Sequence, residues 1–274
     1  MIKAIKIILG LIFAFVLIVL MIIHGNPVSN ILVNINAKAY LQENFQGTDF
    51  EIERVDYDFK TGNYYAKVKS PSSADSSFTL YAGLNGKIGY DSYENLVVER
   101  WNTANRINDY YRSAVNTVLR NPEFPYGVDI GFGDIEFANS DALADEATPD
   151  YAVKTESLEL DKNYDVNDFG SKAGHLTVYV FDEIVSYENL AKVLLEIKNL
   201  MDEANVSFFI IDCVLEYPKP EDMSQWNDDR VEVMGMFYDE IYEDGLAHRV
   251  KKSDEKAKAY YKAQDELKLG EEIL

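Results

Sequence analysis

The chain has few of the residues on which disulfide-rich domains and metal sites depend. Its 274 residues include 1 Cys, 3 His, 2 Trp and 7 Pro. The single cysteine, Cys213, excludes an intramolecular disulfide framework, and the N-terminal region offers no cysteine to acylate as in a lipoprotein. No HExxH or CxxC spacing is present. Because zinc sites use such spacings, we expect no metal.

Basic residues are also scarce. The chain has 26 Lys and Arg against 47 Asp and Glu, a formal net charge of −21 at pH 7. Nucleic-acid binding needs basic surface that neutralises phosphates, so nucleic acid is a poor partner for this surface. The composition is 47% hydrophobic and includes 19 Tyr, which is too apolar for a disordered chain. We therefore expect an acidic, globular protein.

Only one long apolar run is present, Ile7–Ile23, and it follows Lys3 and Lys6. A helix of about this length nearly matches the roughly 30 Å hydrocarbon core of a bilayer. The run predicts a single transmembrane anchor, residues 1–24, with the membrane as a partner through residues 5–23. The positive-inside rule places the N-terminus in the cytoplasm and the rest outside the cell. The alternative is a cleaved signal peptide, but the run exceeds the usual apolar region of about 7–15 residues.

Some 250 residues follow the anchor, enough for two domains. In the first, residues 25–122, a helix ends near Phe45 and four strands with alternating apolar residues follow it. A phase change near Glu53-Arg54 predicts a bulge, and Asn85-Gly86 is a strong hairpin signal. A long covering helix is predicted over Glu94–Arg120.

The second predicted domain, residues 123–274, is less regular. A strand broken at Gly131-Phe132-Gly133 and a weak strand near Leu158 precede a clearer strand–helix–strand segment. That segment runs from His175 to Tyr217, and its helix is capped by Ser186, which favours a parallel crossover in a mixed sheet. A C-terminal helix ends the chain. The predicted fold class is α+β, an N-terminal transmembrane helix followed by two extracytoplasmic two-layer domains.

Three stretches of the first domain resemble the YfjL-like family. They are Gly25-Asn26-Pro27, Tyr57–Val68 (YDFKTGNYYAKV) and Ser70-Pro71-Ser72-Ser73. The resemblance covers about residues 20–120, and it implies an uncharacterised single-pass membrane protein of Bacillus or a relative, without assigned functional residues. A helix with an antiparallel meander is also similar to small PepSY-type and cystatin-like modules, a likeness of fold that says little about function.

No motif for catalysis or cofactor binding stands out. Asp161–Asp165 begins like a calcium loop, but Val166 replaces its glycine and Lys172 its final glutamate, so an Asx-rich turn is favoured. Cys213 lies among apolar neighbours, which predicts a buried core residue and no nucleophile. Paired acids such as Asp228-Asp229 and Asp239-Glu240 are expected to be solvated. We therefore predict no catalytic, cofactor-binding or metal residues.

Tyrosines are the remaining lead. Neighbouring strand residues point to opposite faces, so Tyr65 and Tyr81 are predicted to point away from the core, with Trp101 nearby on the covering helix. These three are the candidate partner contacts, although sheet propensity also explains such rings. We predict a membrane-anchored extracytoplasmic interaction or regulatory protein with an unknown protein or cell-wall partner, in a Gram-positive envelope. The alternative is a cell-envelope hydrolase that uses carboxylates.

Overall fold

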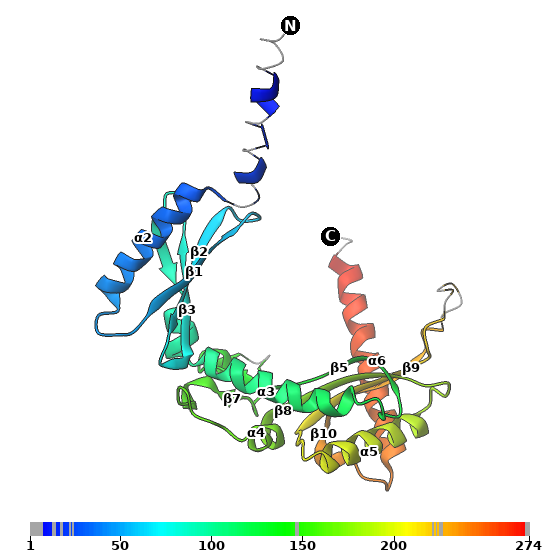
Figure 1. Cartoon of the computed structure of the whole chain (residues 1–274). Helices are drawn as coiled ribbons and strands as arrows, with labels where there is room; N and C mark the ends of the chain where they lie inside the picture. Colours follow the sequence, from blue (N-terminus) through cyan, green and yellow to red (C-terminus); the bar gives the residue numbers. More distant parts are fainter. Residues whose placement is uncertain are drawn as a thin grey trace. The chain divides into compact units, whose positions relative to one another are not determined.

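The computed structural model describes residues 8–271 apart from residues 13, 14, 17, 18, 22, 24, 146, 147, 221, 223, 225 and 226 (Figure 1). The chain forms two compact units. Unit 1 comprises Met1–Ala104 and Thr155–Lys162, and unit 2 comprises Asn105–Lys154 and Asn163–Leu274. Both combine helices with a sheet, so the fold is α+β.

Unit 1 contains helix α2 (Pro27–Asn44) and strands β1 (Glu51–Asp58), β2 (Asn63–Ser70), β3 (Ser73–Ala82) and β4 (Ile88–Asp91). The strands form an antiparallel sheet in the order β1-β2-β3-β4, and α2 packs on one of its faces (Figure 1). The predicted meander is confirmed. Its bulge lies at Glu53, where the register shifts, and the Asn85-Gly86 turn places Gly86 at φ +76°.

The core of unit 1 lies between α2 and the sheet. Alternation in β2 buries Tyr64, Ala66 and Val68, as predicted, while the residues between them point to the opposite face. Val33 and Ala37 from the inner side of α2 are fully buried against these strands. The face of the sheet opposite α2 therefore carries Tyr65 and its neighbours.

The predicted helix over Glu94–Arg120 is wrong as a single element. A π-helical turn, Glu94–Val98, is followed by a break, and α3 begins only at Trp101 and runs to Leu119. Arg100 in the break has φ +66°, a left-handed conformation that a continuous right-handed helix excludes. The Arg100 side chain donates to the carbonyl oxygens of Val97 and Val98 and so caps the turn before the break.

The segment Thr155–Lys162 belongs to unit 1 although unit 2 flanks it on both sides in the sequence. It begins with a 3₁₀ turn, Thr155–Ser157, and the strand predicted near Leu158 is absent from this described segment. Leu158 is buried instead, and Leu160 packs against the unit 1 core. A short segment distant in sequence thus completes this core.

Unit 2 is built on a sheet in the order β10-β9-β8-β5. Its strands are β5 (Gly127–Ile135), β8 (Gly174–Phe181), β9 (Ile210–Glu216) and β10 (Arg230–Phe237). β8 and β9 are parallel and the other neighbours antiparallel, which confirms a mixed sheet. Its helices are α3 from Asn105 onward, α4 (Val166–Ala173), α5 (Tyr187–Glu203) and α6 (Leu246–Glu271). The short strands β6 (Phe137–Ala138) and β7 (Val153–Lys154) pair with each other apart from this sheet.

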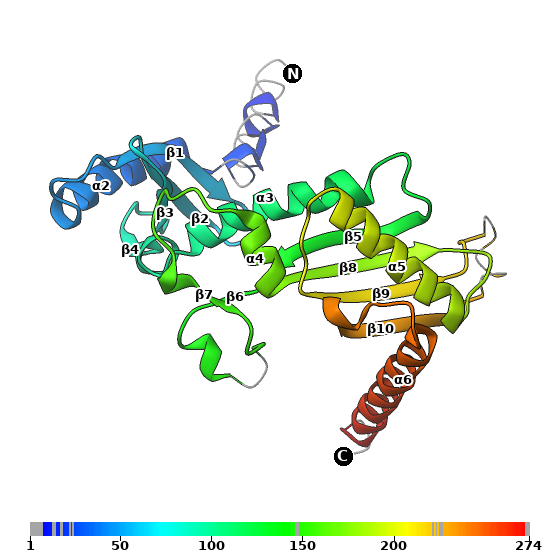
Figure 2. The same ribbon diagram turned by 90° about the horizontal axis from the view of Figure 1, so that it is seen from below.

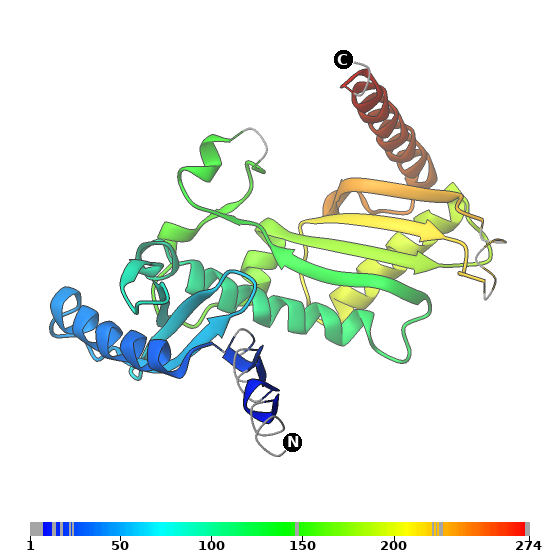
Figure 3. The same cartoon turned by 90° about the horizontal axis from the view of Figure 1, so that it is seen from above.

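Helices α4 and α5 cover one face of this sheet (Figure 2), whereas the opposite face is open in Figure 3. Both edges are closed by side chains from helices. Along β10, the backbone N–H groups of Glu232 and Met234 donate to Asp254 and Ser253 of α6. At the other edge, the Asn108 amide of α3 pairs with both the N–H and the carbonyl of Ile135. At these positions, the backbone N–H and C=O groups of the edge strands that have these partners are not available to pair with another strand.

Strand β5 is continuous, so the break predicted at Gly131-Phe132-Gly133 is wrong. The irregularity lies earlier, at Asp129, where the pairing with β8 shifts. Gly133 marks a close approach, because a Cβ there would lie 2.8 Å from side-chain atoms of Leu176 and Val115.

The N-terminal anchor is the main correction. Residues 1–7, 13, 14, 17, 18, 22 and 24 lie outside the described residues, and the described residues between 8 and 23 are helical. Among the residues that the structure describes, no helix is both long enough and apolar enough to cross a membrane. The predicted transmembrane helix and the single-pass cell-membrane location are therefore wrong, and the extracytoplasmic placement of the domains loses the observation on which it was based.

Candidate functional site

Two of the three candidate contact residues come together on the face of the unit 1 sheet opposite α2. Tyr65 and Tyr81 are cross-strand partners, with ring centroids 5.2 Å apart in an edge-on arrangement. Tyr90 of β4 stacks on Tyr81, with centroids 4.2 Å apart and planes within 6°. We call Tyr65, Tyr81 and Tyr90 the tyrosine row.

The ends of the tyrosine row differ in exposure. Tyr90 is 61% exposed, whereas Tyr65 and Tyr81 are half-buried. The Tyr65 hydroxyl lies 3.0 Å from the Thr61 hydroxyl, which in turn donates to Asp58. Partial burial, and then the neighbouring Tyr90, raise the pKa of Tyr81 above its ordinary value. The row is thus a preorganised aromatic surface that ends in solvent.

Trp101, the third candidate, is the first residue of α3 and is half-buried. The ring contacts found among the described residues of this face join the three tyrosines and do not include Trp101. The prediction of Trp101 as a partner contact stays a prediction.

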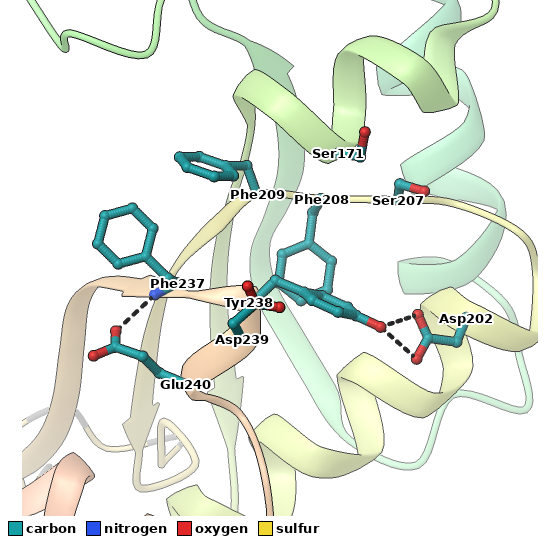
Figure 4. Close-up of a pocket in the computed structure, with 9 residues that line it drawn as sticks. All are labelled: Ser171, Asp202, Ser207, Phe208, Phe209, Phe237, Tyr238, Asp239 and Glu240. Carbon is teal, nitrogen blue, oxygen red and sulfur yellow. Dashed lines mark hydrogen bonds between the residues drawn. The ribbon is translucent and has the colours of Figure 1, made fainter.

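A second candidate site is a groove of about 650 Å³ in unit 2 (Figure 4). We call it the aromatic groove. It lies where the C-terminal end of β10, the entry to β9, and helices α4 and α5 meet. Its lining residues are Ser171, Asp202, Ser207, Phe208, Phe209, Phe237, Tyr238, Asp239 and Glu240.

Local hydrogen bonds fix the shape of the aromatic groove. The Tyr238 hydroxyl reaches the Asp202 carboxylate at the end of α5, 2.9 and 3.0 Å from its two oxygens (Figure 4). Burial, and then this hydrogen bond, raise the pKa of Tyr238. On the other side, Glu240 accepts from the Phe237 N–H at 3.0 Å, which holds the turn Tyr238–Glu240 against the end of β10.

Aromatic contacts connect the groove to a charged cluster on the open face of the unit 2 sheet. Phe237 packs edge-on against Phe209, and Phe209 packs against Tyr151, with centroids 5.2 and 5.0 Å apart. Burial first, and then Glu136 and Asp212, raise the pKa of Tyr151 to about 12. Tyr151 therefore stays a neutral phenol beside these two carboxylates near pH 7.

The cluster is centred on His175, at the start of β8. His175 Nδ1 lies 2.9 Å from Glu136 Oε1, and Nε2 lies 3.1 Å from Asp212 Oδ2. The second contact is an ion pair and not a hydrogen bond, because Nε2 is poorly aligned with the carboxylate oxygen. Asp212, followed by Glu136, raises the pKa of His175 to about 9. At neutral pH the ring is an imidazolium and has no lone pair with which to act as a base.

Two other residues from the sequence have structural roles. Cys213 is fully buried in β9, which confirms its prediction as a core residue, and burial raises the pKa of its thiol. Asp161 does not belong to an open loop. Its carboxylate accepts from the Asp75 N–H at 3.1 Å, and its own N–H donates to the Asp75 carboxylate.

Sequence reasoning missed Tyr90 and the aromatic groove. The signal for Tyr90 was available, because the hairpin at Asn85-Gly86 brings the following strand back against Tyr81. The groove had no such signal, since Asp239-Glu240 looks like any solvated acidic pair. Phe209 and Phe237 lie beside this acidic pair only because β10 packs next to the entry to β9 in the folded chain.

Comparison with known proteins identifies the family. The YfjL-like N-terminal domain matches residues 1–92, and the YfjL-like C-terminal domain matches residues 110–251. No curated protein matches the chain. A crystal structure of a DUF5037 family protein from Ruminococcus gnavus ATCC 29149 is similar at 14% identity, over 68% of this chain and 74% of that chain. Its TM-score of 0.20 is too low to establish a common fold. The two domain matches together span most of the sequence, and the chain belongs to the YfjL-like family.

Proposed function

We propose that this chain is an interaction or regulatory protein, and that the tyrosine row contacts its protein partner. The observation that supports this proposal is the continuous contact from Tyr65 through Tyr81 to Tyr90 on a sheet face opposite α2. Tyrosine is enriched at protein interfaces because its ring buries a large area while its hydroxyl still finds a polar partner. A source in Bacillus or a relative, which the resemblance implies, stays a prediction.

A purely structural role for the row is the competing explanation. Aromatic cross-strand pairs stabilise a sheet by about 0.2–1 kcal/mol relative to alanine pairs, with or without a partner. That explanation accounts well for Tyr65 and Tyr81, which are half-buried against each other. It accounts less well for Tyr90, which leaves 61% of its surface in solvent at the end of the row.

The alternative function, a hydrolase that uses carboxylates, needs two acids in contrasting environments. The aromatic groove holds Asp202, Asp239 and Glu240, and all three are exposed. Their exposure gives no ground for assigning one as acid and another as base, so the groove adds no support for hydrolysis.

Site-specific photocrosslinking in the native host tests the proposal. A photoreactive phenylalanine analogue replaces Tyr90 in one strain and Tyr110 in another. These two tyrosines are matched, at 61% and 57% exposed, and Tyr110 lies on α3 outside the row. We expect one discrete adduct at position 90 and none of that mass at position 110.

The same adduct should disappear when Tyr65→Ser and Tyr81→Ser are added, while circular dichroism shows that the sheet remains folded. Equal labelling at both positions, or an adduct that survives the two serine substitutions, would remove the row as the contact surface.

A further inference from the structure

We propose that the aromatic groove of unit 2 binds the guanidinium group of an arginine side chain presented by another protein. The groove is independent of the tyrosine row, which lies in unit 1, so this inference extends beyond the function proposed above. It rests on the shape of the groove, its aromatic wall and the sign of its charge.

The volume of the aromatic groove and its phenylalanine rings define which side chain it can accommodate. About 650 Å³ exceeds the size of one side chain and accommodates an arginine with its flanking backbone. Phe237, 41% exposed, and Phe209 stand together at one side, where Figure 4 shows Glu240 beneath Phe237. An apolar ring face next to a carboxylate is the setting in which a flat cation with an apolar stem binds.

The charge of the groove selects a cation. Asp202, Asp239 and Glu240 contribute three carboxylates, and none of the nine lining residues is basic. The hydrogen bonds from Tyr238 and from the Phe237 N–H use only part of the accepting capacity of Asp202 and Glu240, because a carboxylate offers about four lone-pair sites. Charge complementarity therefore favours a cation and disfavours an acidic or phosphorylated partner.

Guanidinium fits better than ammonium for a geometric reason. Its plane stacks on an aromatic ring while its edge donates two parallel hydrogen bonds to a carboxylate. Lys198 already occupies one face of the Tyr238 ring, with Nζ 3.8 Å from the centroid, and Phe208 packs edge-on against the same ring at 5.1 Å, so Tyr238 is a poor stacking partner. Phe237 is the most exposed phenylalanine of the groove, and Asp239 and Glu240 lie two and three positions after it in the chain.

Binding of a small probe to the intact chain tests the proposal. N-acetyl-L-argininamide carries one guanidinium, and N-acetyl-L-citrullinamide has nearly the same shape without the charge. We titrate each into isotopically labelled full-length protein and follow the amide resonances of Phe237 to Glu240. We expect saturable shifts with the arginine probe at a dissociation constant of about 1 mM, and none with the citrulline probe.

Two variants that each remove two negative charges distinguish binding in the groove from nonspecific attraction of the cationic probe to an acidic protein. Asp239→Asn with Glu240→Gln removes two groove charges and keeps an acceptor for the Phe237 N–H. Asp228→Asn with Asp229→Asn removes two exposed charges at the opposite end of β10, about 25 Å away at 3.3 Å per strand residue. We expect about tenfold weaker binding in the first variant and unchanged binding in the second.

The ring is tested by Phe237→Leu, which keeps an apolar side chain and removes the aromatic face. It should weaken arginine binding about threefold while leaving both charges in place. The proposal is overturned if the citrulline probe binds equally well, if the Asp228/Asp229 variant loses as much affinity as the groove variant, or if the resonances do not move.

Discussion

Asp75 and Asp161 hydrogen-bond to each other's backbone. The Asp75 N–H donates to Asp161 Oδ1 at 3.1 Å, and the Asp161 N–H donates to Asp75 Oδ2 at 2.8 Å. Thr103 donates to the same Asp75 oxygen at 2.8 Å, and Asp75 is only 1% exposed. This reciprocal pair fastens the segment Thr155–Lys162 to strand β3 within unit 1.

Replacing Asp161 with alanine should release that segment. Alanine loses the acceptor for the Asp75 N–H, and it must also adopt φ +59°, which costs a non-glycine residue more than it costs Asp or Asn. We expect a loss of about 1–3 kcal/mol of local stability. Hydrogen exchange of the amides between residues 155 and 162 measures it. Asp161→Asn keeps an acceptor and tolerates this backbone, so protection close to that of the parent chain is expected there.

Asp254 should protect the β10 edge of the unit 2 sheet from pairing with another chain. It is fully buried, accepts from the Glu232 N–H at 3.1 Å, and also accepts from Tyr187 and Lys258. Asp254→Ala leaves a strand N–H unpaired, which should cost about 1–3 kcal/mol and promote pairing between chains. Urea unfolding and light scattering test both effects. Glu255→Ala, one position along the same helix, should change neither, and scattering that rises in both variants would exclude the edge as the cause.

The His175 cluster predicts a stability that depends on pH. The pKa of His175 is raised from 6.5 to about 9, so the folded protein holds this proton more tightly than the unfolded chain does. Its stabilisation is therefore complete below pH 6.5 and disappears as the pH rises through about 9. At 1.36 kcal/mol per pH unit, the loss is at most about 3 kcal/mol.

Urea unfolding at a series of pH values, monitored in unit 2, measures this loss. His175→Asn cannot bind the proton, so its stability should stay flat over the same interval. A variant that keeps the slope of the parent chain would assign the pH dependence to another group.

Gly170 should tolerate no side chain. A Cβ at this position of α4 would overlap the carbonyl oxygen of Ser207, a backbone atom that cannot turn aside. Gly170→Ala must therefore displace α4 from the strand entry at one side of the aromatic groove, with a cost of about 1–3 kcal/mol. Gly83→Ala is the control, since the nearest atom to its Cβ would be Asn85 Oδ1 at an ordinary 3.6 Å. Thermal unfolding of both variants gives the comparison, and equal midpoints would contradict the predicted clash.

Local patterning was sufficient to predict most of the unit 1 sheet. Alternation in Tyr64–Val68 assigned both faces of β2 correctly, and the phase change at Glu53 located the bulge, because each signal lies within a few residues of the structure that it encodes. The break at Arg100 was missed, since the apolar spacing continues across it and only the backbone changes. Helix α4 was not predicted either, because it spans only 8 residues and follows the Asx-rich stretch Asp161–Asp165, which is typical of a turn.

Features that depend on distant segments could not be predicted. Nothing in the sequence near Leu160 indicates that it packs on a sheet formed by residues 51–91. That contact depends on tertiary packing between segments far apart in the sequence. The His175 cluster combines residues from three separate segments, so no spacing marks it. The apolar run at the N-terminus was misleading in another way. Its length predicted a transmembrane helix, but no helix among the described residues is long and apolar enough to cross a membrane.

The split of unit 1 across the sequence has a consequence for biosynthesis. After Ala104 is made, 58 further residues (105–162) must be added before unit 1 is complete. At about 5–20 residues per second, the ribosome needs roughly 3–12 s to supply the missing segment. The sheet of unit 1 is therefore synthesised before Leu158 and Leu160. Until these residues are added, part of the hydrophobic surface of unit 1 stays exposed. Folding of the N-terminal half is thus coupled to translation of the C-terminal half, and a ribosome stalled between residues 104 and 162 would carry an incomplete domain that chaperones should recognise.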